Sequence, residues 1–449
     1  MAIREVVFFD VLFIDGSNIA FRNLILANGF LNTNGKEGAG AAIRAEGRSS
    51  INISNCIFRN NHAQGFGGGA IRMETRSFLN ISEAIFENNT TDGLDIAGEI
   101  SDSGAGAISV DTDSDLSIQS STFSRNKGTD GGAINIHESH LTISNTVFFR
   151  NDVAEKGAID DFAHGFGGAL LADTSKERSE TVTGDVTISE TIFDRNSGIR
   201  GGSFYIKASQ LDGVFFDRNV VSNNFAIANG GGGSFNGNFD SNLQTPSPAI
   251  EILNSSFINN LSSESGGALE LSIFDNPMSI TNSTFSANKA NQFSNRFSRG
   301  GGAIFVRNGG KVLNIINSTF ANNVAAFTDG AIWSFADRDI SLLNTVFAYN
   351  KAGDGSQGRN HTNKAFRDAG GNIQSTELSS NETLVAEDVI LLDPRLDDLK
   401  EINGLLIHPL KEGSPAIDAG IIFGAPDKDQ LGNFRDDNPD IGAVEFGLD

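Results

Sequence analysis

A four-point pattern that recurs along most of the chain constrains its fold more than any other feature. Each copy opens with two apolar residues at positions 0 and 2, followed by Phe at position 7 and Asn at position 10. In the copy FLNISEAIFENN these residues are Leu79, Ile81, Phe86 and Asn89. A repeat of roughly 20–50 residues is typical of solenoids, in which each unit buries its apolar side against its neighbours.

The Phe and Asn positions of the pattern form two series. The Phe series is Phe58, Phe86, Phe123, Phe148, Phe193, Phe257, Phe285, Phe320 and Phe347. The Asn series is Asn61, Asn89, Asn126, Asn151, Asn196, Asn260, Asn288, Asn323 and Asn350. Another copy that ends at Phe216 and Asn219 has a weaker start, and a degenerate copy contains Ile19, Phe21 and Leu26. The chain has 35 Phe but two Tyr, which favours buried rings without a hydroxyl that needs a partner.

Parity along the pattern predicts the path of the chain. Positions 0 and 2 lie on one face of a strand, but the steps from 2 to 5 and from 7 to 10 are odd and require bends. Asn recurs at position 4, as at Asn55, and tolerates the left-handed backbone of a corner. A Gly-Gly pair supplies a third bend before a short Ala-Ile strand. We therefore expect an all-β, right-handed parallel β-helix with three short strands per coil; the glycine pairs and β-branched runs disfavour a helical solenoid.

The pattern stops after Asn350 and divides the chain. Residues 1–352 are predicted to form about eleven coils, and residues 353–449 a linker with an irregular, β-rich C-terminal region that caps the open end of the core. The first residues alternate like a strand and carry no export signal, so we expect a chain that lacks its N-terminal cap. Insertions between the Asn and the next Gly-Gly should align on one flank, as a binding face or as tolerated loops without function.

The composition narrows the classes of partner. A net charge of −23 disfavours nucleic acid and anionic lipid as ligands. The sequence contains no apolar run long enough to predict a membrane helix. The single cysteine, Cys56, falls at position 5, where residues are small and inward, so it is interpreted as a core residue.

Candidate catalytic residues are sparse. Glycoside hydrolysis needs two carboxylates at a defined separation. The best local cluster is Asp160, Asp161 and His164, which lie within five positions of one insertion. They are similar to elements of polygalacturonase-like enzymes, but there those elements lie on separate coils. A solvated acidic loop is the preferred interpretation.

No cofactor is predicted, and calcium is left open at two places. Asp111, Asp113 and Asp115 would share one face of an extended strand, although the Gly and Glu of an EF-hand are missing. The C-terminal region is rich in Asp, with Asp427 and Asp429 as the candidate ligands. His137 and His140 are three residues apart, which on a strand directs them to opposite faces and disfavours a joint zinc site.

Two family resemblances rest on motifs in the chain. Gly-Gly-Ala-[Ile/Leu] and Phe-x-x-Asn resemble the repeats of polymorphic outer-membrane proteins of the chlamydial type, which implies a surface-exposed β-helix with an adhesive role. EGSPAIDAG (412–420) and DKDQLGNFRDDNPDIGAVEFG (427–447) resemble the choice-of-anchor Q domain of bacterial surface and secreted proteins. The resemblances imply an extracellular or cell-surface location and no known catalytic activity.

Together these features predict a non-enzymatic adhesion or recognition protein whose ligand is a carbohydrate or another cell surface. The alternatives are a β-helix polysaccharide lyase or glycoside hydrolase, and a structural spacer within a longer surface protein. Paired carboxylates facing one groove across adjacent coils would favour the enzyme. A face with stacked polar side chains and no such pair would favour the binder.

Overall fold

The computed structural model is all-β, with one short 3-10 helix, η1 (Lys36–Gly38), among the residues described. The structure describes the chain apart from residues 1–3, 8–11, 101–103, 112, 154–163, 175–184, 209–212, 238–248, 273–276, 292–299, 308–311, 336–338, 354–359, 377–381 and 448–449. It divides into two compact units, Met1–Gly213 and Val214–Asp449, which are described separately. Within the described residues, no helix is long and apolar enough to span a bilayer.

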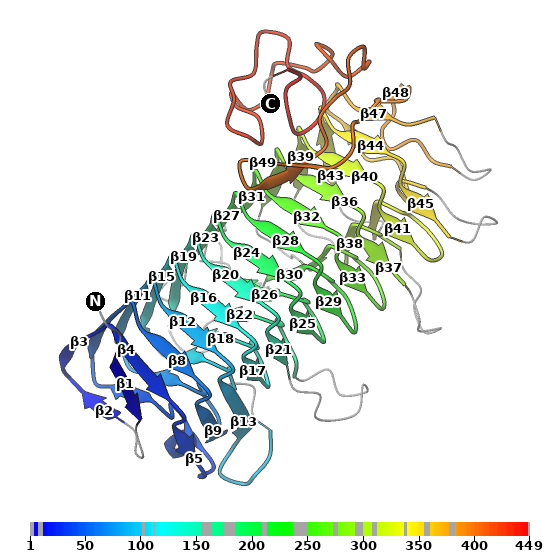
Figure 1. Cartoon of the computed structure of the whole chain (residues 1–449). Coiled ribbons are helices and arrows are strands. Elements are labelled where there is room, and N and C mark those ends of the chain that lie inside the picture. The colour runs from blue at the N-terminus through cyan, green and yellow to red at the C-terminus, as the bar shows by residue number, and fades with distance from the viewer. Residues whose placement is uncertain are drawn as a thin grey trace, which may run out of the picture. The chain divides into compact units, whose positions relative to one another are not determined.

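Unit 1 (Met1–Gly213) contains four parallel sheets (Figure 1). Sheet A consists of β1 (Arg4–Val7), β4 (Leu24–Ala27), β8 (Ile57–Arg59), β12 (Ile85–Glu87), β16 (Thr122–Ser124), β20 (Val147–Phe149) and β24 (Ile192–Asp194). Sheet B consists of β2 (Leu12–Asp15), β6 (Ile43–Glu46), β10 (Ile71–Met73), β14 (Ile108–Val110), β18 (Ile134–His137), β22 (Leu170–Asp173) and β26 (Phe204–Ala208). Sheet C consists of β3 (Asn18–Arg22), β7 (Ser50–Ser54), β11 (Phe78–Ser82), β15 (Asp115–Gln119), β19 (His140–Ser144) and β23 (Val186–Ser189). Sheet D consists of β5 (Phe30–Leu31), β9 (His62–Gly65), β13 (Thr90–Leu94), β17 (Lys127–Gly128), β21 (Asp152–Val153) and β25 (Ser197–Gly198).

Unit 2 (Val214–Asp449) repeats the arrangement, and its sheets take the same letters. Sheet A consists of β28 (Val220–Ser222), β32 (Ser256–Ile258), β36 (Thr284–Ser286), β40 (Thr319–Ala321), β44 (Val346–Ala348), β47 (Ile373–Gln374) and β48 (Ile390–Leu391). Sheet B consists of β30 (Gly233–Gly237), β34 (Leu269–Ser272), β38 (Ile304–Val306) and β42 (Ile332–Ser334). Sheet C consists of β27 (Val214–Asp217), β31 (Ile250–Leu253), β35 (Met278–Thr281), β39 (Leu313–Ile316), β43 (Ile340–Leu343) and β46 (Arg367–Asp368). Sheet D consists of β29 (Phe225–Ala226), β33 (Leu261–Ser262), β37 (Lys289–Ala290), β41 (Val324–Ala325) and β45 (Lys351–Ala352), and β49 (Lys400–Ile402) pairs antiparallel with β50 (Leu405–Ile407).

The coils stack in register, as the repeat predicts. Ile51 pairs with Leu79, and Phe58 pairs with Phe86, in neighbouring parallel strands. The corner after sheet C is left-handed, with φ of 49° at Asn55, so the corner role expected for position 4 is confirmed. The chain is therefore a parallel β-helix, and each coil closes its core against the next.

Both predicted ladders are present. Phe58, Phe86, Phe123, Phe148 and Phe193 stack with ring centroids 4.7–5.0 Å apart in unit 1, and Phe257, Phe285, Phe320 and Phe347 stack at 4.7–5.1 Å in unit 2. The Asn amides bond coil to coil; Asn89 Nδ2 donates to Asn126 Oδ1 (3.0 Å) and to the carbonyl of Phe58 (3.0 Å). Each buried ring contributes about 2–3 kcal/mol of transfer free energy, and the amides satisfy corner groups that water cannot reach.

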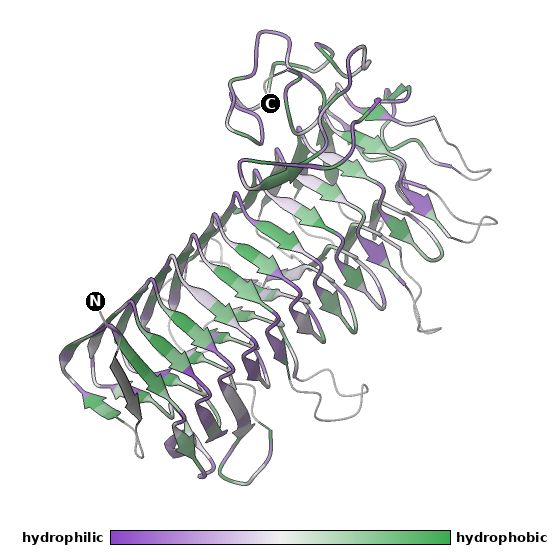
Figure 2. Cartoon of the chain, viewed as in Figure 1, coloured by the Kyte–Doolittle hydropathy of each residue, from purple (hydrophilic) through white to green (hydrophobic). Residues whose placement is uncertain are grey.

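Each coil has four strands, not three as the sequence predicts. The additional strands form sheet D, which follows the Asn ladder, and most of them contain two residues. Such short strands offer no alternation for periodicity to detect. An apolar composition does not reveal these strands either, because some of them, such as β37 and β45, include hydrophilic residues (Figure 2).

The copy that was placed at Phe216 and Asn219 is shifted in register. Val214 and Phe216 pair with Ile250 and Ile252 of sheet C, so they occupy positions 0 and 2 and not 5 and 7. Val221 pairs with Phe257 and takes the ladder position, while Asn224 donates to Asn260 Oδ1 (3.0 Å). The sequence FDRN matches the Phe-x-x-Asn motif without being a ladder element.

The C-terminal region does more than cap the end of the core. β46, β47 and β48 add to sheets C and A beyond Ala352. The chain then folds back along the outer face of sheet A in unit 2, with β50 beside β32 (Figure 1). Ser256 Oγ donates to the carbonyl of Leu406 (2.8 Å), and Ala443 N donates to Thr319 Oγ1 (3.2 Å). The assignment of residues 353–449 to a separate anchor-type region stays a prediction.

Candidate functional site

The outer face of sheet C in unit 1 carries a groove of about 430 Å³. It spans β3, β7, β11 and β15, whose side chains alternate between the core and this face. The polar side chains that line it are Arg22, Asn52, Ser54, Asn80, Ser82, Ser117 and Gln119. Because these strands pair in register, Asn52 faces Asn80 and Asn80 faces Ser117. The groove therefore repeats amide and hydroxyl groups from coil to coil.

The hydrogen bonding of this face leaves groups available to a ligand. Asn80 Nδ2 donates to Asn52 Oδ1 (3.2 Å), and both side chains are exposed. Among the described residues, the amide nitrogen of Asn52 and the amide oxygen of Asn80 make no hydrogen bond. None of the described residues that line the groove is Asp, Glu or His, and Arg22 is the charged one. The groove can bind polar ligands but lacks the two carboxylates of glycoside hydrolysis.

A column of ionisable side chains lies at the ends of the sheet B strands in unit 1. They share one register position, at or next to the end of each strand: Glu46, Glu74, Asp111, His137, Asp173 and Lys207. Their charges are paired within the column or with an arginine beside it. Lys207 Nζ lies 2.9 Å from Asp173, and Arg44 lies 2.7 Å from Glu46.

His137 is hydrogen-bonded within this column. Its Nδ1 lies 3.3 Å from Asp111 Oδ1, and this hydrogen bond raises the pKa of the imidazole. Glu74 is held by Arg72, whose side chain is almost fully buried. Carboxylates on adjacent coils thus face one flank, but each has a cationic or histidine partner. Paired charges of this kind link neighbouring coils, and His137 with Asp111 is one histidine–carboxylate pair of the type that acid-base chemistry uses.

The proposed catalytic cluster is partly outside the described residues, since Asp160 and Asp161 fall within 154–163. His164 is described, and its Nδ1 lies 3.5 Å from Oδ2 of the buried Asp130. Asp130 Oδ1 accepts the backbone N–H groups of Gly165 (2.7 Å) and Phe166 (2.9 Å). Asp130 thereby fixes the end of this insertion against the coil, and a catalytic role for the three candidates stays a prediction.

The first calcium candidates point to different partners. Asp111 contacts His137, whereas Asp113 Oδ2 lies 3.7 Å from Arg76 Nε. Asp113 has φ of 54°, so the chain does not continue as one extended strand from Asp111 to Asp115. Across the described residues, no three His, Cys, Asp or Glu side chains are grouped to hold a metal ion. Calcium here stays an untested prediction.

The Asp-rich C-terminal region uses its buried carboxylates to fix its own backbone. Asp429 Oδ1 accepts the N–H groups of Leu431 (2.9 Å) and Asn433 (2.8 Å), and Asp429 is almost fully buried. Asp440 Oδ1 accepts the N–H of Asp418 (2.8 Å), and burial raises the pKa of Asp440. Asp427, in contrast, is exposed.

Three other residues named from the sequence have plain structural positions. His137 ends β18 and His140 begins β19, with a left-handed Glu138 between them, so the two imidazoles belong to different sheets. Cys56 is buried at the inward position predicted for it, and burial raises the pKa of its thiol.

Neither the groove nor the ionisable column was singled out from the sequence. The column carries a signal in the sequence, because each member lies three residues after the large apolar residue that begins its sheet B strand. The groove carries none, since its side chains occupy outward positions that the repeat leaves free. A comparison with protein-family models and a search of curated proteins both give no match.

Proposed function

We propose that this chain is a non-enzymatic recognition protein that binds an extended polysaccharide in the groove on sheet C of unit 1. The observation that supports it is the in-register repetition of amide and hydroxyl side chains across β7, β11 and β15. Parallel strands repeat every 4.7–4.9 Å or so, which is close to the rise of one sugar ring along an extended glycan. Sugar hydroxyls both donate and accept, as do these side chains.

The location follows from the same proposal. The Gly-Gly-Ala-[Ile/Leu] and Phe-x-x-Asn motifs resemble adhesive repeats of outer-membrane proteins, and residues 412–447 resemble a choice-of-anchor Q domain. We therefore place the protein outside the cell or at a bacterial cell surface, either alone or within a longer surface protein. The net charge of −23 favours a neutral glycan as the ligand over a polyanion.

The test compares binding with turnover. The full chain would be run by affinity electrophoresis through gels that contain neutral or acidic polysaccharides, with and without Ca²⁺. The double variant Asn52→Ala/Asn80→Ala should weaken binding about tenfold, since each lost hydrogen bond contributes about 0.5–1.5 kcal/mol. The matched control is Asn314→Ala, an exposed outward residue of β39 in unit 2. Equal retardation of the double variant and the parent would overturn the assignment of the groove.

An enzyme of the lyase or hydrolase class is the second candidate. It is favoured by one observation, the carboxylates of Glu74 and Asp111 on adjacent coils. Release of reducing ends or unsaturated products in the same samples would support it. Glu74→Gln and Asp111→Asn should then abolish that release while the groove variants retain it. A protein that neither binds nor cleaves any polysaccharide would leave the role of a structural spacer.

A further inference from the structure

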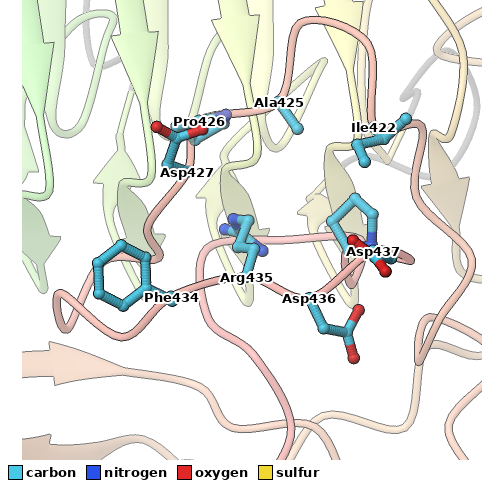
Figure 3. Close-up of a pocket in the computed structure, with 9 residues that line it drawn as sticks. Ile422, Ala425, Pro426, Asp427, Phe434, Arg435, Asp436 and Asp437 are labelled. Atoms are coloured by element: carbon cyan, nitrogen blue, oxygen red, sulfur yellow. The ribbon is translucent and has the colours of Figure 1, made fainter.

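A second hollow, separate from the groove, lies on the C-terminal region of unit 2. It has a volume of about 280 Å³ and is bordered mainly by Ile422, Asp427, Phe434, Arg435, Asp436 and Asp437 (Figure 3). The segment that forms it is held to the outer face of sheet A. Thr284 Oγ1 donates to Gln430 Oε1 (2.6 Å), and Asn282 Nδ2 donates to the carbonyl of Lys428 (2.7 Å). The hollow therefore belongs to a fixed part of unit 2.

The charge of this hollow is unbalanced. Asp427, Asp436 and Asp437 are exposed, and no cation of the described chain lies within ion-pair distance of them. Arg435, the cation that borders the hollow, has a side chain 2% exposed and is neutralised by Glu445. Three carboxylates thus face solvent without a counter-charge, in a chain whose net charge is already −23.

The hollow also has an apolar wall. Phe434 is 71% exposed and Ile422 is 61% exposed, so both side chains can contact a ligand. Lys428 Nζ lies 4.7 Å from the centroid of the Phe434 ring, although Lys428 does not border the hollow. The ring therefore already attracts one ammonium group of the chain itself, by the cation–π interaction.

Arg435 brings one further polar group to the border of the hollow. Its Nη atoms donate to Glu445, Asn282 and the backbone carbonyls of residues 440, 442 and 443. Its Nε is buried and makes no hydrogen bond within the described residues. An unsatisfied buried donor costs about 1–3 kcal/mol, and this one lies at the border of the hollow.

We propose that this hollow receives a lysine or arginine side chain from a partner polypeptide. The aliphatic part of that side chain packs on Ile422 and Phe434, and the charged end reaches Asp436 and Asp437. A metal ion fits less well, because the described carboxylates are not grouped to hold one. An uncharged ligand would leave the carboxylates unpaired.

The experiment uses the full chain and a peptide with one arginine flanked by leucine, GGLRLGG, with GGLELGG as the charge-reversed control. Saturation-transfer NMR, observed on the peptide, measures the weak affinity expected for one side chain. We expect Asp436→Asn/Asp437→Asn to weaken binding of the arginine peptide about tenfold. Phe434→Ala should weaken it about threefold, and added salt should weaken it further.

Two matched variants separate this site from general acidity and stickiness. Glu412→Gln removes an exposed carboxylate, and Phe423→Ala removes a ring that is 90% exposed, but neither residue borders the hollow. Both should bind like the parent. Equal binding of the two peptides, or an unchanged affinity in the Asp436/Asp437 variant, would overturn the proposal. The assay contains no polysaccharide, so its outcome is independent of the groove on sheet C.

Discussion

Removing one rung of the Asn ladder tests how the coils are held together. Asn288 is fully buried in unit 2. Its Nδ2 donates to the carbonyl of Phe257 (2.8 Å) and to Asn323 Oδ1 (2.9 Å). Its Oδ1 accepts the backbone N–H (3.0 Å) and the side-chain Nδ2 (3.0 Å) of Asn260. The change Asn288→Ala deletes all four hydrogen bonds. Because the site is buried, water does not easily replace the lost amide.

The free energy lost in Asn288→Ala depends on which hydrogen bonds the partners of Asn288 retain. The Asn260 backbone N–H loses its acceptor, which costs about 1–3 kcal/mol for a buried donor. Asn260 Nδ2 still donates to Val221 O, and Asn323 Oδ1 still accepts the Asn288 N–H. These lost bonds and the one to Phe257 cost about 0.5–1.5 kcal/mol each. We therefore expect the free energy of opening of this part of the solenoid to fall by about 4 kcal/mol.

Hydrogen exchange followed by mass spectrometry is the suitable assay, because repeat arrays do not unfold in one step. Amides of β32, β36 and β40 should lose protection, whereas unit 1 should be unaffected, since each coil contacts its neighbours alone. Asn314→Ala, on the exposed face of the same unit, should change protection by less than about 0.5 kcal/mol. A decrease in the free energy of opening below about 1 kcal/mol at β32 and β36 would refute the reasoning, because the ladder hydrogen bonds would then be hardly more favourable than hydrogen bonds to water.

Two further predictions concern the core and the end of the ladder. Phe285→Ala should lower the free energy of opening of the coils around it by about 3–5 kcal/mol and Phe285→Leu by less, measured by the same hydrogen exchange, because the ring stacks at 4.7 Å on both Phe257 and Phe320. Equal losses would contradict a ring-specific contribution. Burial lowers the pKa of His361 from 6.5 to about 3, so the folded chain keeps it neutral while the unfolded chain protonates it below pH 6.5. The free energy of unfolding does not depend on His361 titration above that pH. Below it, this free energy should fall by roughly 1.4 kcal/mol per pH unit as the pH approaches 3. His361→Gln should flatten this part of the pH profile, and an unchanged slope would contradict the assignment.

The parts of the fold that could be predicted are those where the same core volume and the same backbone corner recur in every coil. Phe58 and Phe86 recur because a stacked ring fills the same volume in each coil, and Asn61 and Asn89 recur because the same corner leaves the same backbone groups unsatisfied. Sheet D escaped prediction because two-residue strands have no period. The copy at Phe216 was assigned to the wrong register because an apolar Phe216 fits position 2 as well as position 7 of the pattern. Only the weak start before Val214 indicated the shift.

The candidate sites could not be predicted for a different reason. Asn52 and Asn80 are outward residues, and neither core packing nor corner geometry restricts them. Their proximity follows from the register that the repeat predicts, but nothing in the repeat marks this outward position as a binding position. The hollow beside Phe434 depends on how the C-terminal region folds back, which no repeat records. Residue types alone suggested calcium there, yet Asp429 is occupied with backbone N–H groups.

The path of the C-terminal region has a cause in the coils that it covers. In unit 2 the outward residues of sheet A are small or uncharged, such as Ser256, Thr284 and Ala321, and they are buried. In unit 1 the same face carries residues such as Arg59 and Glu87, whose burial against a chain would cost more than it returns. The change from charged to small outward residues therefore selects where the region docks. Because its buried side is used for this docking, its outer side, where the exposed Phe434 and its neighbouring carboxylates lie, is the side open to a partner.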